Sequence, residues 1–190
     1  MKEKMKSKFF LYVLMAMALT ALSGCLFSPP PTAGTVEQPP IVNNSPINVL
    51  RNVERSYNTM DYDLYKSCLS NNYVFYFNPN DVGEIVQGYE IPVTWNRVED
   101  LESAYHMFGQ AYSITMSIPT EAVGEPGPSD KTWRADNITI SLTLLTSPGN
   151  GLRIGAGYCN FEFERYDVNV GTKVEHRWRL SRWWDYTRDA

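Results

Sequence analysis

The segment "WRLSRWWDY" (residues 178–186) lies in the last apolar strand pattern of the chain and indicates how that strand meets the core. In an extended strand, neighbouring side chains point to opposite faces of the sheet. Trp183 and Trp184 are adjacent, so we expect one in the core and the other on the outer face. Large aromatic side chains dominate both cores and interfaces. The segment therefore predicts a sheet with one buried face and one partly aromatic outer face.

Four segments in the second half of the chain have the two-residue period of strands. They cover residues 113–118, 133–146, 152–166 and 173–187. Gly155 and Gly157 lie inside the third segment, which favours a bulge or a sharp bend there because glycine has no side chain to pack. Four strands in succession predict a mostly antiparallel sheet.

The preceding part of the chain predicts three helices, with one strand (residues 72–78) between the second and the third. Ser45 and Pro46 favour the start of the first helix. A short second helix follows in "DYDLYKSCLS" (61–70), capped by Asp61 or Asp63. The third helix is expected to begin with Thr94 as its cap. Its expected apolar face consists of Trp95, Val98, Leu101, Tyr105 and Phe108. Helices grouped on one side of such a sheet give an α+β fold.

Three passages resemble the NTF2-like (SnoaL-type, cone-shaped) superfamily. They are "VLRNVERSYNTMDYDLYKSCLSNNYVFYF" (49–77), "WNRVEDLESAYHMF" (95–108) and "WRLSRWWDY" (178–186). The last looks like the W-x-I-x-x-W-x-D ending of NTF2-like bacterial lipoproteins, matched by Trp178, Leu180, Trp183 and Asp185. The resemblance covers nearly all of residues 45–190. It implies three helices on a strongly curved sheet, with an apolar pocket between the long helix and the concave face.

The resemblance leaves the function open. Some members of the superfamily are isomerases, dehydratases, cyclases or epoxide hydrolases that use an Asp in the pocket, often with His, Tyr or Arg. No catalytic motif of those enzymes matches this chain residue by residue. We therefore expect a non-catalytic module that binds a small apolar ligand or a protein partner. The alternatives are a pocket enzyme of the isomerase, dehydratase or cyclase type, and a homodimeric assembly module that uses the sheet face at Trp183 or Trp184.

Three residues are candidates for acid–base chemistry under the enzyme hypothesis. By alternation His176 shares a face with Trp178, although an inert, half-buried His is the favoured interpretation. Asp136 and Asn137 interrupt an apolar strand, and strict alternation would turn one of them inward, whereas a bulge or edge position is the commoner case. Asp81 lies in "NPND", which favours a turn cap. The expected pocket-lining residues are Trp95, Tyr105, Phe108 and Trp178.

The sequence predicts neither a metal site nor a cofactor. It contains only two His, and no group of His, Cys and Asp has ligand spacing. Cys68 and Cys159 leave two alternatives open. An oxidising compartment would permit a disulfide, whereas their apolar flanks favour two buried free thiols.

The N-terminus resembles the signal peptide of a bacterial lipoprotein. Four Lys precede fourteen uncharged residues (9–22), fewer than the about 20 that cross a bilayer. "LSGC" (22–25) resembles a lipobox, which implies removal of residues 1–24 and acylation of Cys25 with diacylglycerol and palmitate. Two or three acyl chains would hold the protein on a membrane. Leu26 after the cysteine implies sorting to the outer membrane, facing the periplasm, in a host with two membranes.

Residues 25–44 then form an acylated, Pro-rich linker to a domain over residues 45–190, because such a segment has too little apolar surface to fold. Without residues 1–24 the chain has 13 basic and 20 acidic residues, a net charge of −7. This charge excludes a nucleic-acid partner, which needs clustered Lys and Arg. It also predicts that the lipid alone, and not basic residues, holds the chain at an anionic membrane.

Overall fold

A computed structural model describes residues 39–86, 88–148 and 150–187. The expected signal peptide, Cys25 and most of the Pro-rich linker lie outside these residues. No helix among the described residues combines the length and the apolar character needed to span a membrane. The folded unit is Pro40–Ala190, so it takes in residues 40–44, which the sequence analysis assigned to the linker.

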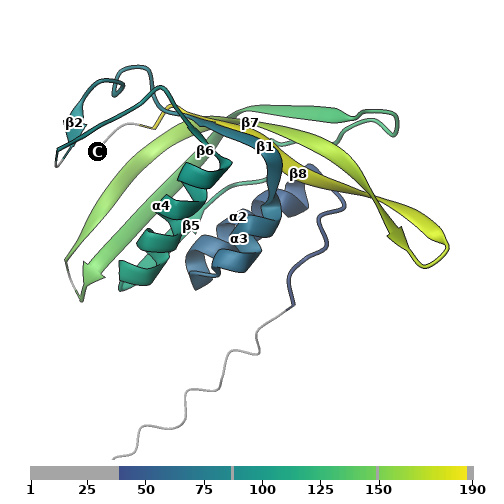
Figure 1. The fold of residues 1–190 in the computed structure, drawn as a ribbon, viewed down its shortest axis with the longest axis horizontal. Helices are drawn as coiled ribbons and strands as arrows, with labels where there is room; N and C mark the ends of the chain where they lie inside the picture. Colours follow the sequence, from purple (N-terminus) through teal and green to yellow (C-terminus); the bar gives the residue numbers. More distant parts are fainter. Residues whose placement is uncertain (1–38, 87, 149, 188–190) are drawn as a thin grey trace, which may run out of the picture. The chain divides into compact units, whose positions relative to one another are not determined.

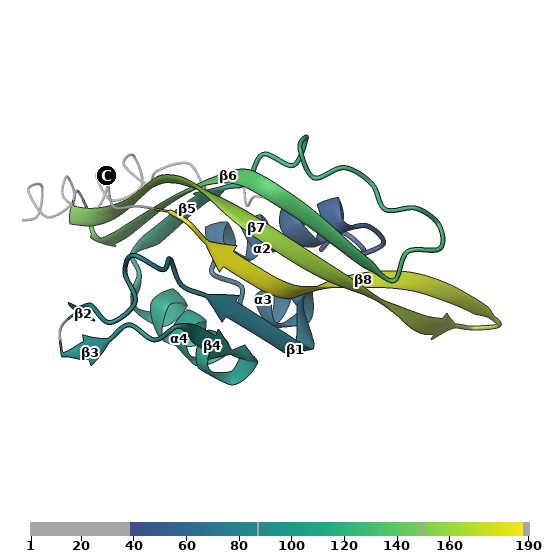
Figure 2. The same cartoon turned by 90° about the horizontal axis from the view of Figure 1, so that it is seen from above.

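Six strands form one sheet in the order β4-β1-β8-β7-β6-β5 (Figures 1 and 2). Neighbouring strands pair antiparallel except β1 and β8, which are parallel. The bounds are β1 Leu69–Tyr76, β4 Thr94–Asn96, β5 Ser113–Ser117, β6 Thr132–Ser147, β7 Asn150–Val170 and β8 Lys173–Asp185. A separate small hairpin consists of β2 (Ile85–Val86) and β3 (Tyr89–Glu90). The α+β prediction is therefore confirmed.

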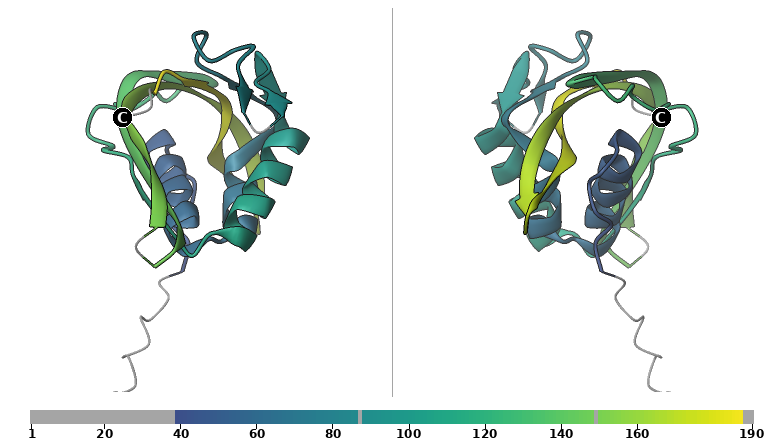
Figure 3. Two further views of the ribbon diagram at one scale, coloured as in Figure 1. Left: turned by 90° about the vertical axis from the view of Figure 1, so that its left-hand side faces the viewer. Right: turned by 90° about the vertical axis from the view of Figure 1, so that its right-hand side faces the viewer.

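Three helices lie on the concave side of the curved sheet, under the arch that Figure 3 shows. They are α2 (Pro46–Thr59), α3 (Tyr62–Cys68) and α4 (Arg97–Gln110). The core between the two layers contains side chains from every helix and from the central strands. Its fully buried members include Val49, Leu50, Val53, Tyr65, Tyr73, Phe161, Phe163 and Leu180. Each such large apolar side chain contributes about 1.5–3 kcal/mol on burial.

The long helix α4 begins two residues later than the sequence predicts, with Asn96 and not Thr94 as its N-cap. The Asn96 side chain accepts hydrogen bonds from the backbone N–H groups of Val98 and Glu99, and the Glu99 carboxylate accepts one from the Asn96 backbone N–H. Such a capping box satisfies N–H groups that the first turn leaves free. Thr94 and Trp95 belong instead to β4, which pairs with β1.

The residues before α2 are attached to the domain. The Trp178 backbone N–H donates to the Asn43 carbonyl at 2.7 Å. The buried Asn52 side chain of α2 exchanges hydrogen bonds with the Ile41 backbone and donates to the Asn43 side chain. Residues 41–43 are thus fixed between α2 and β8.

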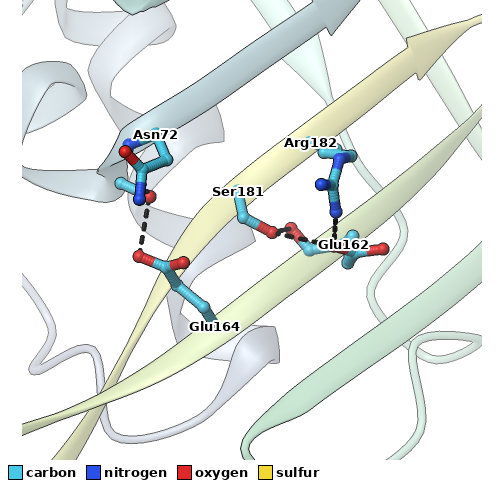
Figure 4. Close-up of polar contacts among 6 residues, drawn as sticks. Asn72, Glu162, Glu164, Ser181 and Arg182 are labelled. Carbon is cyan, nitrogen blue, oxygen red and sulfur yellow. Dashed lines mark hydrogen bonds and ion pairs between the residues drawn. The ribbon is translucent and has the colours of Figure 1, made fainter.

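A bulge at Ser181 decides which tryptophan faces the core. In the ladder between β7 and β8, Phe163 pairs with Leu180 and Glu162 pairs with Arg182, so Ser181 is an extra residue. The Ser181 hydroxyl donates to the Glu162 carbonyl at 2.9 Å, and Arg182 forms an ion pair with the Glu162 carboxylate (Figure 4). Because the bulge shifts the alternation by one residue, Trp183 joins the buried face and Trp184 lies outside.

The same outer surface holds a second polar contact beside this bulge. The Asn72 backbone N–H donates to the Ser70 hydroxyl, which donates to the Glu164 carboxylate at 2.7 Å (Figure 4). Further along, the Trp184 ring stacks on Tyr76 at 5.1 Å, with the Arg134 guanidinium 4.6 Å from the Trp184 ring centre. The outer face is therefore both charged and aromatic.

Candidate functional site

A cavity of about 220 Å³ lies between α4 and the concave face of the sheet. Its walls are mainly aromatic and aliphatic. The aromatic residues that line it are Tyr57, Phe75, Phe77, Trp95 and Trp183. A cavity of about 150 Å³ is known to hold a benzene ring, so this one has room for a single ring with a short side chain. Ligand pockets are typically apolar with a few polar groups, which is the composition found here.

Asp100 places a carboxyl group at the wall of this cavity. It lies on the buried face of α4, next to Leu101 and one turn before Ala104. The Tyr65 hydroxyl donates to Asp100 Oδ2 at 2.8 Å. Burial raises the pKa of Asp100 to about 6, while the Tyr65 and Tyr73 hydroxyls oppose part of that rise. Asp100 therefore changes its protonation close to neutral pH.

Three tyrosines surround this carboxyl group. The Tyr57 ring meets the Tyr65 ring edge-on, with their centres 5.3 Å apart. Burial raises the pKa values of Tyr57, Tyr65 and Tyr73, and the negative charge of Asp100 is the second-largest cause. All three are thus neutral donors at neutral pH. The buried Tyr73 hydroxyl makes no hydrogen bond with any described residue.

Asp185, at the end of β8, is the second carboxylate of the cavity. Its Oδ1 accepts a hydrogen bond from the Thr187 backbone N–H at 2.8 Å and one from the Cys159 thiol at 3.6 Å. Burial, and next the charge of Asp185, raise the pKa of Cys159, so the thiol stays protonated and donates. Cys159 and Cys68 are both buried and unpaired, so the disulfide alternative does not occur in this structure.

Neither cavity carboxylate has a cationic partner among the described residues. None of those that line the cavity is Lys, Arg or His, and the ion pairs in the described part of the chain do not include Asp100 or Asp185. Over the same residues, no group of three or more His, Cys, Asp or Glu could hold a metal ion.

Comparison with known structures identifies the fold. A conserved protein from Planctomyces limnophilus superposes with a TM-score of 0.53 and 15% identity, over 75% of this chain and 92% of that one. A Novosphingobium aromaticivorans protein, provisionally described as an aromatic ring hydroxylase, gives 0.50 and 11%, over 75% and 89%. The chain has the NTF2-like cone fold. At these identities the likeness extends to the fold alone. No protein-family model and no curated protein matches the sequence.

His176 does not reach the cavity of the NTF2-like cone. It is exposed, and its Nδ1 lies 2.7 Å from Asp167 Oδ1 on the neighbouring strand. The alternation that linked His176 to Trp178 does hold. However, the hairpin of β7 and β8 extends past the helices (Figure 1). His176 lies near the turn of this hairpin and is exposed.

Asp136 and Asp81 also lie outside the cavity. Asp136 and Asn137 both face solvent, because a second bulge separates Ala135 from Ile138 and Asn137 adopts a left-handed φ of 59°. Asp136 pairs with Arg134 at 2.8 Å. Asp81 lies in a turn, where its backbone N–H donates to the Asn78 carbonyl at 2.9 Å.

Of the four expected lining residues, Trp95 lines the cavity, and it does so from β4. Its indole N–H donates to the Tyr89 hydroxyl at 2.9 Å. Phe108 and Trp178 are buried in the core but are not part of the cavity wall, and Tyr105 is 62% exposed. Tyr105 points outward because the buried face of α4 is rotated from the expected one.

Sequence reasoning missed Asp100 as a site residue. The buried face of α4 consists of Asp100, Leu101, Ala104 and Phe108, whereas the expected stripe member Val98 is 71% exposed. One feature of the sequence indicates the position of Asp100. Asp100, Ala104 and Phe108 are four residues apart, which places them on one face of the helix. Asp185 was noted in the sequence as part of a structural ending, and its place in the cavity follows from the bulge at Ser181.

Proposed function

We propose that this domain binds a small, largely apolar molecule in the cavity of the cone. The observation that carries this proposal is an aromatic cavity of about 220 Å³ with few polar groups. An aromatic ring buries about 150–250 Å², which at about 25 cal/mol per Å² favours binding by about 4–6 kcal/mol before the entropy lost on association. Simple ring-sized probes should therefore bind weakly, and the natural ligand more tightly through its polar groups.

The cellular setting that we propose comes from the sequence alone. The lipobox-like "LSGC" supports a lipid anchor at Cys25 and a position at the bacterial cell envelope, with the domain on the periplasmic side of an outer membrane. The net charge of −7 after removal of residues 1–24 supports anchoring by lipid and not by basic residues.

The test uses the full chain, in nanodiscs of zwitterionic lipid if it carries lipid, because detergent would itself enter an apolar cavity. Native mass spectrometry detects a retained small molecule, and ligand-observed NMR measures the binding of indole and toluene. Ser103→Trp would fill the cavity from its wall, whereas Glu102→Trp adds the same ring on the exposed side of α4. We expect Ser103→Trp to abolish binding and Glu102→Trp to preserve it. Binding that Ser103→Trp leaves intact would contradict the proposal.

A second candidate function is acid–base catalysis on the bound molecule. The observation that favours it is the buried Asp100 with a pKa of about 6 beside neutral tyrosines, since a general base works best with a pKa near the ambient pH. If the retained molecule is chemically altered by the wild-type chain and not by Asp100→Asn, the domain is an enzyme. If both leave it unchanged, the binding function stands alone.

A further inference from the structure

The cavity contains an unbalanced charge. Buried ionised side chains are almost always paired, because removing a charge from water is costly unless an opposite charge or several donors replace the solvent. The Tyr65 hydroxyl donates to Asp100, and the nearby Tyr73 hydroxyl also lowers the pKa of Asp100, but both tyrosines are neutral groups. Asp185 adds a second carboxylate to the same cavity. A positively charged ligand group would balance these carboxylates.

The walls suit a cation as well as an apolar body. Aromatic rings have a negative face and attract ammonium groups, an attraction that increases when water is excluded. Five aromatic residues line the cavity, and four of them pack on one another: the Phe77 and Trp95 ring centres are 4.7 Å apart, and those of Phe75 and Trp183 are 5.7 Å apart. The cavity wall is therefore largely aromatic and contains two acidic groups.

We propose that the cavity recognises an amine, namely a ring-sized apolar molecule with one protonated nitrogen, and that the Asp100 carboxylate is its counter-ion. This inference rests on the proposed binding function and specifies its ligand class. The Tyr65 hydroxyl donates to Oδ2 of the carboxylate, and an ammonium group would add the positive charge that the tyrosines do not supply. Asp185, whose Oδ1 is engaged by Thr187 and Cys159, strengthens the negative potential of the cavity.

Such binding depends on pH in a defined direction. The titratable groups that face Asp100 are Tyr57 on α2, Tyr65 on α3 and Tyr73 on β1, which stay neutral, and Asp185 lines the same cavity from β8. A proton and an ammonium group compete for the Asp100 carboxylate, whose pKa is about 6. The affinity for an amine should therefore rise as the pH rises and level off above that value. One pH unit below the pKa it should be about tenfold weaker.

The decisive experiment compares 2-phenylethylamine with 2-phenylethanol, which have the same ring and chain length but differ in charge. Dissociation constants for the full chain, in the same zwitterionic nanodiscs with empty discs as the blank, are measured by ligand-observed NMR at pH 5 and pH 7.5. We expect the amine to bind at least about tenfold more tightly than the alcohol at pH 7.5, with most of that preference lost at pH 5. Asp100→Asn should abolish the preference for the amine at both pH values and leave the affinity for 2-phenylethanol unchanged.

Matched controls separate the possible outcomes. Asp136→Asn removes an exposed carboxylate outside the cavity and should leave both affinities unchanged. Equal affinities for the two probes at pH 7.5 would overturn the amine inference and leave the binding proposal standing. If neither these probes nor indole and toluene bind, the proposed function itself fails. Should Asp100→Asn not fold, the pH series on the wild-type chain decides alone.

Discussion

Replacing Asp100 by Asn should make the protein more stable at neutral pH. The pKa of this buried carboxyl is about 6 in the folded protein, against an ordinary value of 3.8. Below about pH 4 the carboxyl is mostly protonated in both the folded and the unfolded chain. Between pH 4 and 6 the folded state binds more protons than the unfolded state, so stability falls as the pH rises. Above about pH 6 the destabilisation by ionised Asp100 has reached its full size.

The size of the effect follows from the two pKa values. One pKa unit corresponds to about 1.4 kcal/mol, so ionised Asp100 destabilises the folded state by about 3 kcal/mol at pH 7.5. Asn has a similar shape, and its carbonyl oxygen can still accept the hydrogen bond from Tyr65. Asp100→Asn should therefore raise the free energy of unfolding by up to about 3 kcal/mol at pH 7.5 and change it little at pH 4. For a domain of this size the gain corresponds to about 6–12 °C in Tm.

Urea denaturation followed by tryptophan fluorescence, at half-unit steps from pH 4 to 7.5, measures this difference. Glu102→Gln is the matched control, because it removes an exposed carboxylate from the same helix. Its effect should stay within about 0.5 kcal/mol at every pH. If Asp100→Asn were less stable than wild type at pH 7.5, or if the difference did not change with pH, then burial would not govern this carboxyl and the reasoning would be refuted.

Four further predictions concern other parts of the molecule. Tyr65→Phe removes the hydrogen bond to Asp100, so the pKa of Asp100 should rise further in an NMR titration and stability at pH 7.5 should fall by about 1.5–3 kcal/mol. Asn52→Ala should destabilise the domain by about 1–3 kcal/mol, and hydrogen exchange of residues 41–43 should accelerate, since their hydrogen bonds to Asn52 are lost. Deletion of Ser181, the extra residue of the bulge, should keep Trp183 on the buried face and leave unfolding cooperative in a urea titration, because Leu180, Arg182 and Trp183 then alternate as in a regular strand. Cys25→Ser should release the chain from the membrane fraction and remove the mass of the lipid from the purified protein, whereas unchanged fractionation would contradict lipid anchoring.

Periodicity predicted the fold because most elements obey it without interruption. The order of the three helices and of the five longer strands, the α+β class and the opposite faces of Trp183 and Trp184 follow from regular spacing, whereas the short strands β2, β3 and β4 were not predicted. Which of the two tryptophans is buried does not follow, because the bulge at Ser181 reverses the alternation. At Asp136 and Asn137 strict alternation turns one side chain inward, whereas the second bulge turns both outward.

The candidate site was harder to predict than the fold. Thr94 is an acceptable helix cap, and a helix that starts there has Trp95 and Val98 on its apolar stripe. In the structure the capping box at Asn96 starts the helix later. The later start rotates the buried face of α4, so the expected apolar stripe did not include Asp100. Its charge also argues against burial when only the sequence is considered. Tertiary contacts outweigh that preference, since the Tyr65 hydroxyl comes from a different helix. Residues that break a local rule are often those with a function.

The place of β8 in the sheet affects how the chain is made. This last strand lies between β7 and β1, and Leu69 of β1 pairs with Leu180 of β8. Contacts between residues so distant in sequence form slowly and only after both partners exist. A nascent chain therefore has an incomplete sheet until β8 (Lys173–Asp185) has left the ribosome. The export proposed above, through a channel that admits only unfolded chains, would benefit from this delay, because the chain would stay unfolded until translocation begins.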